Sequence, residues 1–205
     1  MKLRTLLLIS LFGAAAAPGT AGAADPRYPD WPCVQAKVPE ISLAAIWDGP
    51  AIDDAVTTWQ NDPAVANLVT RLAARRVPIE EAEKNIAEFI GAAGSGKTAK
   101  AVAVFAGAFD TLNRQRTEVL DGLERMERRE KDLASRIKED FAALRALQDD
   151  AHPDDAKMAE LNTRIEWSTR IFDDRRKTVR YACEVPAVIE RRLGAIARAI
   201  RQEMD

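Results

Sequence analysis

Residues 98–148, TAKAVAVFAGAFDTLNRQRTEVLDGLERMERREKDLASRIKEDFAALRALQ, place apolar side chains at alternating intervals of three and four. That spacing is the heptad pattern of a helix that packs against a partner helix along one seam. The pattern shifts by one position at Phe141 and continues at Leu144, which is a stutter. The seam residues are Val102, Phe105, Phe109, Leu112, Val119, Leu123, Met126, Leu133 and Ile137, with Arg116 and Glu130 completing it.

A polar turn, Asp149-Asp150-Ala151-His152-Pro153-Asp154-Asp155, separates this run from a second heptad run that Pro186 interrupts. Residues 98–148 and 154–204 are equally long, each about 75 Å as a helix. A short turn between equal runs requires antiparallel pairing, so opposite residues should have numbers that sum to about 302–305. The expected neighbours are Phe105 with Ile200, Phe109 with Ile196, Leu123 with Val179, and Ile137 with Ile165 or Trp167.

Residues 25–97 are expected to form a small helical base at the open end of this hairpin. Residues 25–40, rich in proline and aromatic side chains, should be extended. Residues 99–109 are apolar nearly all round, so we expect short helices of the base to bury them. Four such helices are indicated: Ser42 to Trp47, Ala51 to Gln60, one from Pro63 capped by Asp62, and one opened by Pro78. The sequence thus predicts an all-α protein, with a long antiparallel coiled-coil hairpin over 98–205 whose tip lies near 149–155.

The first 24 residues have the features of a secretory signal peptide. Lys2 and Arg4 precede an apolar run, 6–12, and small residues lead to Ala21-Gly22-Ala23. A permanent membrane span needs about 20 apolar residues, so we expect no transmembrane segment in the mature chain. Cleavage would remove only Lys2 and Arg4 among charged residues, leaving 28 of 30 basic and all 32 acidic residues. That balance argues against nucleic-acid binding, and the expected location is periplasmic or secreted.

The chain has two cysteines, Cys33 and Cys183. An even pair in an oxidising compartment predicts a disulfide. The alternative, two free thiols that carry out redox chemistry, lacks the Cys-x-x-Cys spacing that such chemistry usually uses.

Residues 91–98, Gly91-Ala92-Ala93-Gly94-Ser95-Gly96-Lys97-Thr98, match the phosphate-binding loop G-x-x-x-x-G-K-[ST] letter for letter. In nucleotide-binding proteins this loop follows a buried strand, whereas residues 80–90 have the pattern of an amphipathic helix. We therefore expect a linker between two helices and no bound nucleotide.

His152 is the only histidine, which argues against histidine-based triads and multi-histidine metal sites. The acidic turn around it allows two interpretations. One is a weak site for calcium or another hard cation. The other is turn formation together with helix N-capping by Asp154, because the spacing lacks the order of a dedicated calcium loop. No set of residues indicates a catalytic activity or a cofactor.

Two pairs of residues on or near the seam also allow alternatives. Glu130 and Arg175 would form an ion pair within the seam, or reach separately to water. Trp167 and Ile171, four residues apart and just off the seam, would form an exposed contact for a partner. Alternatively, a seam widened by the stutter would bury them.

Several short stretches resemble an uncharacterised group of exported proteobacterial coiled-coil proteins. These are Trp31-Pro32-Cys33-Val34-Gln35, Val38-Pro39-Glu40, Trp47-Asp48-Gly49-Pro50 and Tyr181-Ala182-Cys183-Glu184-Val185-Pro186. The resemblance covers most of the mature chain and implies no assigned activity or functional residue.

The sequence favours a non-enzymatic periplasmic coiled-coil protein that acts as an interaction or scaffold protein, through a protein partner or self-association. The alternative is a periplasmic holdase-type chaperone, which would hold unfolded clients between the arms of an oligomer.

Overall fold

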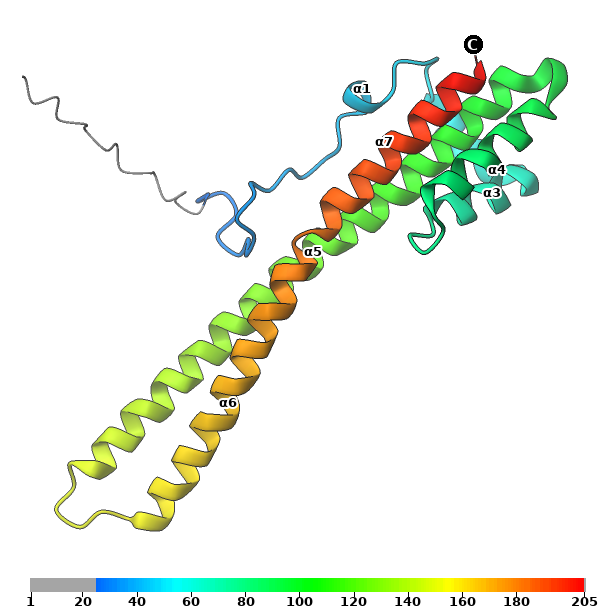
Figure 1. Cartoon of the computed structure of the whole chain (residues 1–205). Coiled ribbons are helices and arrows are strands. Elements are labelled where there is room, and N and C mark those ends of the chain that lie inside the picture. Colours follow the sequence, from blue (N-terminus) through cyan, green and yellow to red (C-terminus); the bar gives the residue numbers. More distant parts are fainter. Residues whose placement is uncertain (1–24, 205) are drawn as a thin grey trace, which may run out of the picture.

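The computed structural model describes residues 25–204, so the predicted signal peptide lies outside the described residues. Within this range the protein is all-α, without a strand. One long helix, α5 (Lys97–Gln148), runs from one end of the molecule to the other (Figure 1). Helices α6 (Asp155–Ala182) and α7 (Val185–Met204) return beside it, which confirms the predicted helical hairpin.

The returning side of the hairpin is broken between Ala182 and Val185. Pro186 lies in the first turn of α7, where its missing backbone N–H leaves no helical hydrogen bond unmade. The sequence predicted an interruption here, and the structure shows two separate helices with a bend between them.

The register of the hairpin is the predicted one. Leu123 shares a buried cluster with Val179, and their numbers sum to 302. Near the tip, Leu144 and Leu161 share another, with a sum of 305.

The base consists of short helices packed around the start of α5 and the whole of α7. Asp62 accepts hydrogen bonds from the amides of Ala64 (2.9 Å) and Val65 (3.3 Å), which confirms it as the predicted N-cap. Pro78 directly precedes the fourth helix. The elements are α1 (Leu43–Ile46), α2 (Asp53–Thr58), η1 (Trp59–Asn61), α3 (Pro63–Ala73), α4 (Ile79–Gly91) and η2 (Gly94–Gly96).

The core of the base surrounds the apolar start of α5, as predicted. The Phe105 side chain is 0% exposed, and its ring stacks on that of Trp47 with centroids 3.9 Å apart. Gly107 allows close contact, because a Cβ there would lie 2.7 Å from Val69 Cγ2 and 2.8 Å from the Trp59 ring. Phe109 is only partly buried, so Phe105 is the central aromatic residue of this core.

Beyond the base, α5 and α6 form a projecting arm with little core of its own (Figure 1). Its buried apolar residues form two small clusters. One consists of Leu123, Val179 and Cys183, and the other of Leu144, Leu161 and Ile165. Between them Arg175 donates to Glu130 Oε1 at 3.4 Å, so of the two alternatives for these residues the ion pair is formed. Glu130 is buried, whereas about half of the Arg175 side chain is exposed.

Candidate functional site

Residues 25–41, which we call the strap, run along one side of the hairpin past the point where α6 gives way to α7 (Figure 1). The predicted disulfide is present: Cys33 and Cys183 have an S–S distance of 2.04 Å and a Cα–Cα distance of 5.6 Å. Beside it, the Gln35 side chain donates to the Cys183 carbonyl at 3.1 Å. The Trp31 indole N–H donates to the Gln35 carbonyl at 2.7 Å. The strap is therefore fixed to the break in the returning helices.

Ion pairs attach the rest of the strap to α5. Asp30 accepts hydrogen bonds from Lys131 (2.9 Å) and Arg128 (3.2 Å), and these two cations hold the pKa of its carboxyl below the ordinary value of 3.8. Lys37 pairs with Glu124 at 2.5 Å. These ion pairs between distant residues restrict the conformation of the strap, which has no regular secondary structure.

Arg116 is the central anchor of the strap, a role that the sequence did not predict beyond its place in the seam. Its side chain is 2% exposed and donates to the carbonyls of Val38 (2.5 Å) and Pro39 (3.2 Å). It also donates to Glu190 Oε1 at 2.5 Å. The numbers 116 and 190 sum to 306, close to the hairpin register. The sequence could therefore have indicated this ion pair, because the register places the acidic Glu190 opposite the seam residue Arg116.

Arg192, in the first half of α7, has a similar structural role. It donates to the carbonyls of Leu72 (2.5 Å) and Val77 (2.8 Å), so it satisfies backbone groups at and beyond the end of α3. Burial lowers the pKa of its guanidinium.

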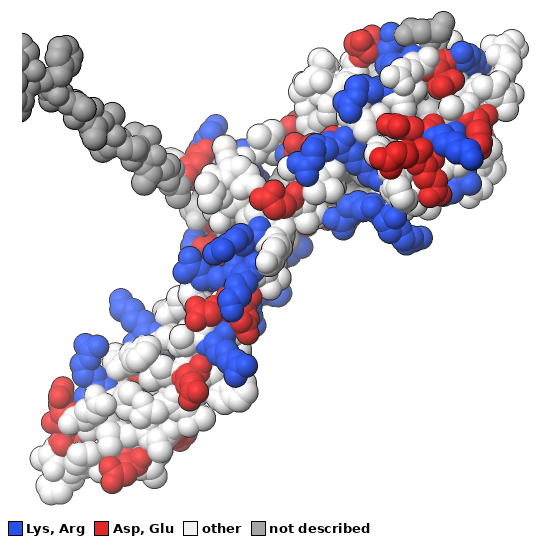
Figure 2. Space-filling view, in the orientation of Figure 1, with Lys and Arg blue, Asp and Glu red and all other residues white. Residues whose placement is uncertain are grey.

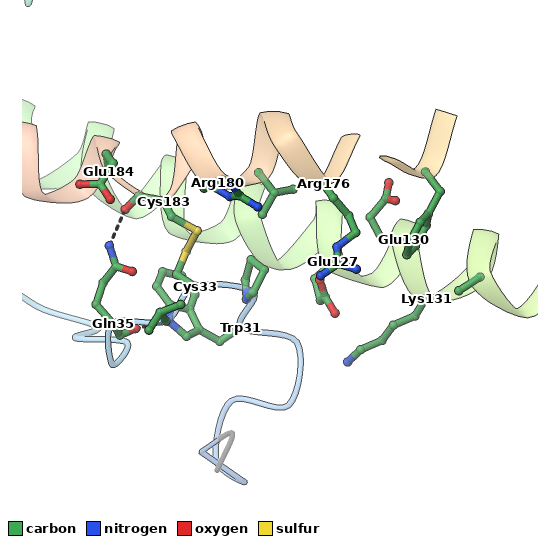
Figure 3. Close-up of a pocket in the computed structure, with 15 residues that line it drawn as sticks. Trp31, Cys33, Gln35, Glu127, Glu130, Lys131, Arg176, Arg180, Cys183 and Glu184 are labelled. Carbon is green, nitrogen blue, oxygen red and sulfur yellow. Dashed lines mark hydrogen bonds between the residues drawn. A yellow bond between two sulfur atoms is a disulfide. The ribbon is translucent and has the colours of Figure 1, made fainter. Parts of the chain in front are cut away.

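A hollow of ≈ 580 Å³ lies between the strap and the arm (Figure 3). Trp31, Phe172 and the disulfide form its apolar walls. Three carboxylates and three cations balance each other around it: Glu127, Glu130, Glu184, Lys131, Arg176 and Arg180. Among the residues that line it there is no thiol, hydroxyl or imidazole. The hollow thus lacks the hydroxyl, thiol and imidazole nucleophiles of covalent catalysis, while Lys131 and the glutamates belong to the other nucleophile classes.

The opposite flank of the arm carries the predicted contact residues. Trp167 is 61% exposed and Ile171 is 42% exposed, and they lie one turn apart on α6. We call these two side chains the apolar patch. Ile171 also lines a shallow hollow with Leu133 of α5, beside an ion pair between Asp140 and Arg164 at 2.6 Å. The seam therefore does not bury these residues, and their predicted role as a partner contact stays a prediction.

Charge is segregated along the arm. Residues 139–169, which we call the acidic tip, contain eight acidic and three basic residues. Residues 125–138 and 170–180, which we call the basic band, contain eleven basic and five acidic residues. Lysine and arginine gather at the middle of the molecule, where the arm leaves the base (Figure 2). The apolar patch lies at the boundary between the two regions.

The glycine-rich loop and the acidic turn are both parts of helix connections. Residues 91–98 run from the last residue of α4 through η2 into the first turn of α5, so a helix rather than a strand precedes the loop. At the turn, Asp150 accepts from the His152 amide at 3.0 Å, and Asp154 caps α6 by accepting from the Lys157 amide at 3.0 Å. Over residues 25–204, no group of three or more histidine, cysteine or acidic residues is placed to hold a metal ion.

None of the helices in residues 25–204 is long and apolar enough to span a membrane. Neither a family model, nor a curated protein, nor a solved structure matches the chain.

Proposed function

We propose that this is a non-enzymatic, exported interaction protein of the periplasm, in which the base holds the arm and the arm presents the apolar patch to a protein partner. The observation that carries the proposal is the 61% exposure of Trp167. Within the described residues, neither Trp167 nor Ile171 is a member of any of the three buried clusters.

An exposed tryptophan on an ordered helix favours binding. Tryptophan is among the residues that contribute most to protein–protein interfaces, because it buries a large rigid surface at a small entropic cost. Removing an exposed large side chain from water is worth about 1.5–3 kcal/mol. The arm offers this surface on helices stabilised at both ends, by the base and by the cluster around Leu144.

The strap supports a passive rather than a catalytic role for the region near the disulfide. Charged side chains of the strap form ion pairs with charged side chains of α5, as in the pairs of Asp30 with Lys131 and of Lys37 with Glu124. The two cysteines are joined, so neither is available as a thiol nucleophile.

A holdase-type chaperone is the second candidate. Phe141, on the arm but outside the shallow hollow of Ile171, is also 46% exposed, so the arm offers apolar surface at more than one place. A chaperone would use such surface for many unfolded clients, whereas a scaffold would recognise one folded partner.

Site-specific photo-crosslinking in intact cells tests the proposal. The photoreactive residue p-benzoylphenylalanine replaces Trp167 in one strain and Thr169, which lines the outer surface of α6, in a control strain. We expect one dominant product from position 167 that is absent from position 169, and purified partner should then bind wild type at least about tenfold more tightly than Trp167→Ser. Many products with unfolded clients would favour the chaperone, and no product specific to position 167 would refute both.

A further inference from the structure

We propose that the partner of the apolar patch is a second copy of this chain, bound with the two arms antiparallel and a two-fold axis near Trp167. This rests on the proposed function, because it assigns an occupant to the same patch. A two-fold interface uses the same surface on both copies, so that surface must be complementary to itself. The arm meets that requirement in charge, in apolar surface and in accessibility.

Charge complementarity is the first argument. Positions on α5 can be projected onto α6 with the register in which opposite numbers sum to about 304. On that scale, at 1.5 Å per residue, the mean position of the acidic residues of the acidic tip lies about 11 Å from Trp167 toward the tip. The mean position of the basic residues of the basic band lies about 11 Å from Trp167 toward the base. A two-fold axis at Trp167 therefore places the acidic tip of each copy against the basic band of the other. A parallel pair would place like charges together, which is unfavourable.

The side chains that share a flank with the patch repeat this arrangement in detail. Glu160, Arg164, Trp167 and Ile171 follow one another on α6 at intervals of four, three and four, which puts them on one face. On α5 the corresponding flank contains Arg129, Leu133, Arg136 and Asp140, three of which line the shallow hollow with Ile171.

With a two-fold axis at Trp167, Glu160 on α6 of one copy and Arg129 on α5 of the other come to nearly the same height along the paired arms, diagonally across the interface. Glu160 lies seven residues from Trp167 toward the tip, and Arg129 lies about eight residues toward the base in the hairpin register. Within residues 25–204 Arg129 has no hydrogen bond or ion pair, and Glu160 is held only by Arg164 at 3.5 Å with its side chain 72% exposed. Both are therefore available to a second copy.

The strap leaves this flank of the arm open. It contacts Glu124, Arg128 and Lys131, and the hollow beneath it is lined by Phe172, Arg176 and Arg180 on the other flank of α6. An axis at Trp167 would bring the tip of one copy, near residue 152, opposite residue 182 of the other. The overlap would thus be about 45 Å long and would end before the base.

The size of this contact predicts a weak dimer. A strip about 45 Å long and one helix diameter wide, about 10–12 Å, buries on the order of 1,000 Å² over both copies. That value is at the lower limit of specific interfaces, so we expect a reversible dimer with a Kd on the order of 10 μM.

Sedimentation velocity of the mature, disulfide-bonded protein from about 1 to about 500 μM tests the proposal. We expect a concentration-dependent dimer that weakens severalfold between about 50 and about 500 mM NaCl, because added salt screens the attraction. Ile171→Ser should weaken it at least about tenfold. Val188→Ser, at a base residue of matched exposure (39% against 42%), should not change it.

A mixing experiment tests the antiparallel geometry itself. Arg129→Glu alone places two acids together at each contact, and Glu160→Arg alone places two bases together, so each variant should be monomeric. An equimolar mixture of the two should dimerise as wild type does, because both contacts then pair opposite charges. Far-ultraviolet circular dichroism of each variant checks that its helices are intact.

The outcomes separate this inference from the proposed function. If wild type stays monomeric at about 500 μM, or if the mixture does not dimerise, the second copy is refuted. The proposed function would still be supported if photo-crosslinking from position 167 captured a different protein. A dimer that Ile171→Ser leaves unchanged would also refute the inference, because its interface would lie elsewhere.

Discussion

Phe105→Ala and Leu144→Ala should differ strongly in their effect on stability, because they remove apolar groups from very different surroundings. Phe105 is 0% exposed, stacks on Trp47 and belongs to the large core of the base. A truncation of a fully buried phenylalanine costs about 3–5 kcal/mol. Leu144 is 7% exposed and shares its buried cluster only with Leu161 and Ile165. Its truncation should cost about 2 kcal/mol, the low end for leucine, because neighbours near the tip can close the space.

Urea denaturation measures both changes. Circular dichroism at 222 nm follows all the helices, including the arm. Fluorescence, measured in a Trp31→Phe, Trp167→Phe background, reports on the buried Trp47 and Trp59 of the base. Phe105→Ala should lower the urea midpoint in both signals, and Leu144→Ala should lower it chiefly in circular dichroism. Phe141→Ala is the matched control, since the same change at a 46% exposed position should cost less than about 1 kcal/mol.

The division into base and arm would be refuted if Leu144→Ala were as damaging as Phe105→Ala in both signals. Base and arm would then unfold as a single cooperative body, and the arm could not be treated as a separate surface for binding.

Four further changes have defined outcomes. Deleting residues 127–172 and joining the helices by a short turn should leave a folded, disulfide-bonded base that no longer binds its partner, as native gel electrophoresis and a binding assay would show. Gly107→Ala should cost about 1–3 kcal/mol in urea denaturation, because its Cβ would overlap a tryptophan ring and a valine methyl. Cys33→Ser should lower the free energy of unfolding by up to about 5 kcal/mol, since the bond to Cys183 closes a loop spanning 150 residues. Hydrogen bonding to a lysine lowers the folded-state pKa of Asp62 below 3.8, so its contribution to stability is present above that pH and lost as the pH falls through the lowered value. Acid titration of Asp62→Asn should therefore show a shallower loss below about pH 4.

The hairpin could be predicted in detail because a heptad seam encodes both the helix and its partner. The pairing of Leu123 with Val179 followed from the register alone, whereas the register left the Glu130–Arg175 ion pair as one of two alternatives. Phe109 is only partly buried although it belongs to the same seam, since the seam pattern does not reveal which of its members the base covers. Phe105 receives that cover from Trp47, a residue outside the hairpin.

The path of the strap could not be predicted from periodicity, because an extended proline-rich segment has none. Its cysteine supplied the single attachment point that the sequence revealed. The remaining contacts depend on side chains that are distant in the chain, such as Arg116 reaching the Val38 carbonyl. Exposure of Trp167 was likewise open, because the stutter near Phe141 allowed a wider seam that the structure does not form.

The break between α6 and α7 has a mechanical consequence for how load crosses the molecule. An uninterrupted helix such as α5 resists bending along its whole length, whereas two helices meeting at a non-helical step form a joint. Cys183 lies in that joint, and its bond leads to a strap that is itself fastened to α5 through Arg116 and Lys131. The covalent bond therefore acts as a strut across the joint. A force on the arm tip is therefore transmitted through the strap to the continuous helix α5, and it does not bend the joint between α6 and α7.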